Sequence, residues 1–150
     1  MKKFKFALDT VLSYKQQVLD ALEAEHAAAM AKVRAQEEVL DAVWQEYRTC
    51  NTEYRERKAE GLSITDAMIY ESSLRSAELH IQRETAKLEK LQAEAEKKRQ
   101  EMVDAKIDTS SLEKLKDKKL EQYRKDEQKS EELLVDEFIS ASRAAAAMSA

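Results

Sequence analysis

The sequence predicts an all-α protein, an antiparallel two-helix coiled-coil hairpin with a C-terminal helical overhang. The chain of 150 residues contains no proline and a single glycine, Gly61, and these are the two residue types that weaken helices most. Charged residues make up 37% of the chain and aromatic residues 6%, which is typical of coiled coils. Disordered chains share this composition, but apolar residues recur here with sustained helical periodicity. We expect a single α-helical domain over residues 1–150.

The first helix is predicted over about residues 8–60. Its later seam positions follow alternating steps of four and three: Ala29, Val33, Gln36, Leu40, Val43, Tyr47, Cys50, Tyr54 and Arg57. Its earlier apolar positions are Leu8, Val11, Val18 and Leu22. The two series do not join in one register, so we expect a stutter near residues 25–29.

The turn is predicted over residues 61–65. Gly61 can adopt the left-handed conformation that closes a helix. Ser63 or Thr65 can cap the next helix, with Asp66 near its positively polarised start. These signals occur together, so the chain is expected to reverse direction here.

The second helix is predicted over about residues 66–145. Its seam positions are Tyr70, Leu74, Ala77, Ile81, Glu84, Leu88, Leu91, Ala95, Lys98, Met102, Ala105, Thr109, Leu112, Lys116, Lys119 and Tyr123. Ser110 and Glu113 match a capping box, which would allow a break near residues 108–111. Because no glycine or proline is present there, we favour a continuous helix.

The two helices differ in length, and this predicts an overhang. Folded back at Gly61, the first helix can cover the second only to about residue 120. Residues 121–150 are then left as a single helix, which is marginal in water, so a partner or conditional order is expected there. The same seam could instead pair two extended chains, an alternative that the pattern leaves open.

Composition excludes several functions. The formal net charge is −4, and the basic groups have acidic neighbours, so we expect no nucleic-acid binding. Lys15, Gln16 and Gln17 interrupt the early apolar residues, which argues against a signal peptide or membrane span. The lone cysteine, Cys50, cannot form an internal disulfide and suits a reducing cytoplasm.

Candidate catalytic and metal-binding residues are sparse. The two histidines, His26 and His80, belong to different helices. His80 and Glu84 are one turn apart, but two ligands without a third make a weak metal site. No glycine-rich phosphate loop is present. We therefore expect no enzyme activity, no cofactor and no metal.

Motifs near both ends resemble the flagellar export protein FliJ family. The start, Phe4-Lys-Phe-Ala-Leu8-Asp-Thr-Val11-Leu12, has an aromatic and basic lead followed by a Val-Leu pair. Near the end, Leu112-Glu-Lys-Leu115, Lys118-Lys119, Tyr123 and Glu127 are followed by Leu134-Val-Asp136-Glu137-Phe138. The valine in this last motif is an addition to the family's Leu-Asp-Glu. Chain length and the central glycine turn are also similar.

The resemblance implies an antiparallel coiled coil similar to the central stalk of rotary ATPases, serving the flagellar type III export apparatus. Expected partners are the export ATPase FliI, its regulator FliH, the export gate protein FlhA and export chaperones. The expected location is cytoplasmic, at most peripheral at the inner membrane through the apparatus. An injectisome stalk or a generic coiled-coil scaffold is the alternative.

Two contact sites are expected. The ATPase-ring contact comprises Phe4, Phe6, Leu133, Leu134, Phe138 and Ile139, apolar residues beyond the paired region. The export-gate contact comprises Tyr70, Ser73, Ala77 and His80. The simpler alternatives are a local cap over the termini for the first set and plain seam packing for the second.

Overall fold

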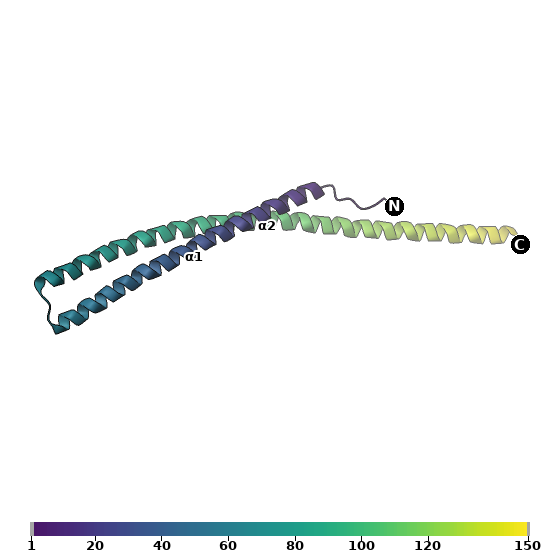
Figure 1. The fold of residues 1–150 in the computed structure, drawn as a ribbon. Helices are drawn as coiled ribbons and strands as arrows, with labels where there is room; N and C mark the ends of the chain where they lie inside the picture. The colour runs from purple at the N-terminus through teal and green to yellow at the C-terminus, as the bar shows by residue number, and fades with distance from the viewer. Residues whose placement is uncertain (1, 150) are drawn as a thin grey trace. The chain divides into compact units, whose positions relative to one another are not determined.

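The computed structural model describes residues 2–149, and Met1 and Ala150 lie outside the described residues. Helix α1 spans Asp9–Glu60 and helix α2 spans Ile64–Ser149 (Figure 1). The two helices pack against each other, and there is no strand within residues 2–149, so the predicted all-α hairpin is confirmed. Compared with the predicted bounds, α2 begins earlier and ends later.

The turn between the helices has the predicted chemistry. Gly61 has a φ of 101°, a conformation that L side chains rarely adopt, and its N–H donates to the Lys58 carbonyl over 3.3 Å. Ser63 is the cap of α2, because its hydroxyl accepts the N–H of Asp66 at 3.1 Å. The helix therefore begins at Ile64, and Thr65 already belongs to its first turn.

The chain divides into two compact units. The turn unit comprises residues 20–103, and the terminal unit comprises residues 1–19 together with residues 104–150. Helix α2 runs without interruption through Asp108–Ser111, as the absence of glycine and proline favours.

The core of the turn unit lies along the predicted seam. Its buried apolar side chains are Val33, Val43, Tyr54, Ile81 and Ala95. Each occupies a position that the steps of three and four assign to the seam. Burying this stripe removes apolar surface from water, at about 25 cal/mol per Å². Pairing of the two faces, rather than helix propensity, stabilises helices of this kind.

The seam of the terminal unit differs from the prediction at one position. Thr109, Leu112, Lys116 and Tyr123 are buried or half-buried as expected, but Lys119 is exposed and Leu120 is half-buried in its place. A step of four after Lys116 turns the leucine inward. This exchange leaves the lysine free to keep its ammonium in water.

The predicted stutter near residues 25–29 is wrong. Burial in α1 follows alternating steps through this stretch, at positions that include two polar residues, Lys15 and His26. The positions that follow these steps are all buried or half-buried: Leu12, Lys15, Leu19, Leu22, His26, Ala29 and Val33. The expected mismatch depends on Leu8, Val11 and Val18 as seam positions, whereas burial follows Leu12, Lys15 and Leu19.

Candidate functional site

An N-terminal arm, residues 2–8, precedes α1 and lies against α2 within the terminal unit. The Phe4 ring lies 5.5 Å from the Tyr123 ring, centroid to centroid, at a tilt of 51°. The Tyr123 hydroxyl donates a hydrogen bond to the carbonyl oxygen of Lys2. An offset aromatic pair of this kind adds about 0.5–1.5 kcal/mol beyond the area that it buries. The arm is therefore docked on α2 through Tyr123.

The start of α1 is held to α2 by ion pairs. The Lys116 ammonium lies 2.8 Å from the carboxylate of Asp9, the first residue of α1. One turn and a half further, Lys15 lies 3.6 Å from Asp108. These pairs are exposed, so each contributes at most about 1 kcal/mol. They align the first turns of α1 with the segment of α2 between Asp108 and Lys116.

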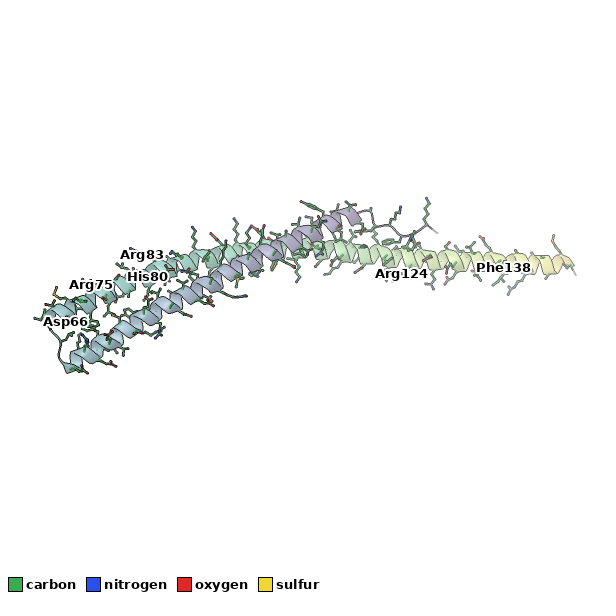
Figure 2. The ribbon with its side chains drawn as sticks, in the orientation of Figure 1. Asp66, Arg75, His80, Arg83, Arg124 and Phe138 are labelled. Atoms are coloured by element: carbon green, nitrogen blue, oxygen red, sulfur yellow. The ribbon has the colours of Figure 1, made fainter. Side chains whose placement is uncertain are left out.

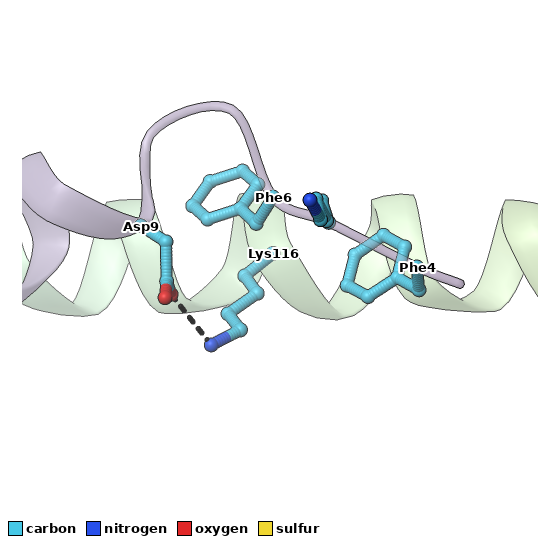
Figure 3. A pocket seen from close by; sticks show the side chains of 5 residues that line it. Phe4, Phe6, Asp9 and Lys116 are labelled. Atoms are coloured by element: carbon cyan, nitrogen blue, oxygen red, sulfur yellow. Dashed lines mark hydrogen bonds and ion pairs between the residues drawn. The ribbon is translucent and has the colours of Figure 1, made fainter. Parts of the chain in front are cut away.

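A hollow of about 320 Å³ lies beside the arm, lined by Phe4, Lys5, Phe6, Asp9 and Lys116 (Figure 3). A second hollow of about 390 Å³ is more apolar, and its lining includes Leu115, Lys119 and Tyr123. Both are open to solvent.

The structure does not bring the six predicted ring-contact residues together. Phe4 and Phe6 are half-buried in the arm beside Tyr123. The other four, Leu133, Leu134, Phe138 and Ile139, are exposed on the last part of α2. Tyr123 and Leu133 are ten residues apart on one helix, or about 15 Å along its axis. The set therefore consists of a docked arm and a separate, exposed stretch of α2.

The distal stretch of α2 is exposed throughout, from Glu131 to Ser149. Phe138 is 73% exposed, and it projects from the helix beyond the first turns of α1 (Figure 2). The side-chain hydrogen bonds here, from Ser149 to Ala145 and from Gln128 to Glu132, stay within α2. The exposed stretch begins later than the predicted overhang, residues 121–150, because the arm covers Tyr123.

The four predicted gate-contact residues lie along one edge of the turn-unit seam. Tyr70 stacks on Tyr54 with ring centroids 5.2 Å apart, and Ala77 is half-buried in the seam. Ser73 and His80 are exposed. Tyr70 and Ala77 therefore pack between the helices, while Ser73 and His80 are available to a partner.

Two of these residues also take part in polar contacts. Tyr70 donates a hydrogen bond of 2.9 Å to Glu53, which raises the pKa of the phenol above its ordinary value. His80 Nε2 lies 3.6 Å from Oε1 of Glu84. These contacts orient side chains beside the seam, and they resemble no catalytic arrangement.

A polar pair crosses the seam in the middle of the turn unit. The Gln36 amide donates to the Glu84 carboxylate and, over 3.1 Å, to the Glu84 backbone carbonyl. The hydrogen bond from Gln36, and after it that from Lys87, holds the pKa of the Glu84 carboxyl below its ordinary value. A buried polar pair in a coiled coil specifies register, because a slipped pairing leaves it unsatisfied.

A second group of polar residues lies around His26. His26, Met30 and Val33 of α1, with Ala95 and Glu96 of α2, line an open hollow of about 400 Å³ in the turn unit. Arg99 donates to Glu96 at 2.8 Å and lowers the pKa of that carboxyl. No group of three metal-ligating side chains occurs among the residues that the structure describes.

Sequence reasoning missed the role of Tyr123 as the docking point of the arm. The residue was assigned to the seam, which the structure confirms, but its partner was left unassigned. The signal was present in the sequence. Tyr123 is an aromatic residue at the end of the paired region, and the chain begins with the aromatic residue Phe4, so a contact between the two could have been predicted.

Over residues 2–149, no helix combines the length and apolar character needed to cross a membrane. Comparison with protein families gives one informative result. The family model described as flagellar FliJ protein matches residues 4–149, nearly the whole chain. No curated protein and no solved structure gives a significant match.

Proposed function

The chain belongs to the FliJ family of flagellar proteins, and on that premise we propose that it acts as a central-stalk-like adaptor of the export ATPase. Membership makes it a component of the flagellar export apparatus, in a family of non-catalytic coiled-coil proteins. The adaptor links the ATPase FliI and its regulator FliH to export chaperones and the gate protein FlhA. Its work is mechanical, so it requires neither a cofactor nor nucleic acid.

One observation carries this proposal. The terminal unit combines a paired region, closed by the docked arm, with a helical stretch whose apolar side chains are exposed. Leu134 is 63% and Phe138 73% exposed, and they are grouped with further exposed apolar side chains, an arrangement that marks interaction sites. An apolar helix end is the form that a stalk requires to enter or rest on an ATPase ring.

The docked arm supports a subsidiary role for Phe4 and Phe6. Both rings are already half-buried on α2, so they offer less free surface to a ring than the distal residues do. We assign the main contact to Leu133, Leu134, Phe138 and Ile139. The arm then covers Tyr123 at the end of the paired region.

Co-purification tests the ring contact. FliI is captured with the full chain and with a variant truncated after Tyr123, which retains the arm and its docking residue. We expect capture by the full chain only, because the truncation removes the exposed apolar residues and leaves the paired region. Circular dichroism of the truncated chain checks that it remains helical. Undiminished capture of FliI by the truncated chain would remove the distal residues from the ring contact.

The gate contact is proposed at the exposed edge of the seam, through Ser73 and His80. Substituting both with lysine leaves the packed residues Tyr70 and Ala77 in place and adds no negative charge beside Glu84, and circular dichroism checks the fold. We expect weaker capture of FlhA and unchanged capture of FliI. Intact FlhA binding by the double variant would exclude this edge.

The location follows from the partners. The apparatus gives the adaptor a cytoplasmic position at the inner membrane, to which it attaches through other proteins. The flagellar family favours the flagellar export system over an injectisome or a generic scaffold. Separation of cytosol and membranes from cells with and without the export apparatus tests this. Membrane association that persists without the apparatus would contradict it.

A further inference from the structure

The distal part of α2 carries a continuous apolar face, here called the distal face. Its members follow one another in steps of four and three: Leu134, Phe138, Ala141, Ala145 and Met148. Val135 widens it on the side of Phe138. All these residues are exposed, Phe138 and Met148 by 73% and 90%. Leu133 is as exposed as Leu134, at 63%, but it points away from this face.

The distal face continues an interface that already packs a helix. Seam positions of α2 that face α1 and the arm include Thr109, Leu112, Lys116 and Tyr123. The same steps of three and four continue from Tyr123 through Glu127 and Ser130 to Leu134. Beyond the arm, the face that α1 covers earlier in the unit is therefore left open. Continuity of the stripe favours another helix as its occupant.

Acidic side chains surround the distal face. Glu131 and Glu137 stand three residues before and after Leu134, one on each side of the face. The acidic residues of this stretch are Asp126, Glu127, Glu131, Glu132, Asp136 and Glu137, and its nearest bases are Lys129 and Arg143. In coiled coils, charges that flank the apolar stripe select the partner, and opposite charges are favoured.

These two observations define the occupant. We propose that the distal face binds an amphipathic helix of a partner protein, with an apolar stripe flanked by lysine or arginine. This rests on the proposed function and deepens it, because Leu134 and Phe138 also belong to the proposed ring contact. A second copy of the chain is disfavoured, since parallel pairing of two distal faces brings Glu131 and Glu137 of both copies together. Anionic lipid is disfavoured for the same reason.

A designed helix tests the proposal on the full chain. The probe is a fluorescent synthetic helix of about four heptads with leucine at a and d and lysine at e and g. Its matched counterpart carries glutamate at e and g. Binding is followed by fluorescence anisotropy at low and physiological salt. We expect the lysine helix alone to bind, with an affinity that falls as salt rises.

Variants locate the binding. Leu134→Ser with Phe138→Ser should weaken binding of the lysine helix by about ten-fold or more, because it removes the centre of the stripe. Glu131→Gln with Glu137→Gln should weaken it and reduce its salt dependence. Leu79→Ser, at an exposed leucine of α2 in the turn unit, is the control and should leave binding unchanged. All these positions are exposed, so the variants fold, as circular dichroism will verify.

Four results would overturn the proposal: equal binding of the glutamate helix, no effect of the Leu134 and Phe138 substitutions, an equal effect of Leu79→Ser, or dimerisation of the chain through the distal face. Dimerisation is measured by mass in solution. The proposed function is judged separately by capture of FliI. Capture that depends on the distal residues, without binding of the lysine helix, refutes the basic helix and leaves the ring contact standing.

Discussion

Tyr123 of α2 contacts the N-terminal arm twice, through its ring to Phe4 and through its hydroxyl to the carbonyl of Lys2. The two contacts use the apolar and the polar part of one side chain. They hold a segment that has no helical hydrogen bonds of its own between residues 2 and 6. The arm thus depends on a single residue of α2 more than on its own backbone.

Replacing Tyr123 with alanine should free the arm while leaving α2 intact, since alanine is the best helix former. Trypsin cleaves after Lys5, and docking limits its access. We expect cleavage there to accelerate by about three- to ten-fold, which corresponds to about 0.5–1.5 kcal/mol for an aromatic pair. Mass spectrometry of the released peptide measures the rate. Arg124→Ala, at an exposed neighbour, is the control, and an unchanged rate in Tyr123→Ala would contradict the docking role.

The Gln36–Glu84 pair predicts a pH dependence. The hydrogen bond from Gln36 lowers the folded-state pKa of Glu84, so its stabilising contribution is present above the ordinary glutamate pKa. It is lost as the pH falls through the lowered pKa. Gln36→Met should therefore be less stable than the native chain at pH 7, and the difference should shrink in acid. Urea unfolding at a series of pH values measures this.

The control for the pH experiment is Gln45→Met, at an exposed position of the same helix. It should show no difference that varies with pH. A stability difference for Gln36→Met that stays constant from neutral pH into acid would mean that Gln36 contributes by packing alone. That result would mean that ionisation of the Glu84 carboxylate does not contribute to the stability difference.

The sequence predicted most of the seam because helical periodicity and burial have the same physical origin. Val33, Val43 and Tyr54 were assigned from spacing alone and are buried. The seam was assigned wrongly where a polar residue occupies a half-buried position. Lys15 and His26 are half-buried despite their polar groups, since long or planar side chains can cover a seam with their apolar parts.

The candidate site was less predictable, because it depends on non-helical backbone. Phe4 and Phe6 were grouped with Phe138 on the basis of apolar character near both ends. The arm folds against Tyr123 instead, a contact that no periodicity encodes. Exposure of Leu134 and Phe138 follows from the length difference between the helices, which the position of Gly61 determines.

Gly61→Ala should destabilise the hairpin by about 1 kcal/mol. An added Cβ meets nothing within 4 Å, so the cost comes only from the backbone, whose φ of 101° an L residue rarely adopts. Thermal unfolding followed by circular dichroism measures it. Glu60→Ala, at the exposed end of α1, should have little effect. Equal stability of Gly61→Ala and the native chain would show that the turn relaxes without strain.

Ile81 and Ile69 provide a matched test of where the turn unit is stabilised. Both lie on α2, but Ile81 is 8% exposed on the seam and Ile69 is 60% exposed. Ile81→Ala removes buried apolar surface and leaves a cavity, so we expect a loss of about 2 kcal/mol in the free energy of unfolding. Ile69→Ala should change it by less than about 0.5 kcal/mol. Urea unfolding of the two variants gives both values, and an equal loss would mean that the seam does not hold the two helices together.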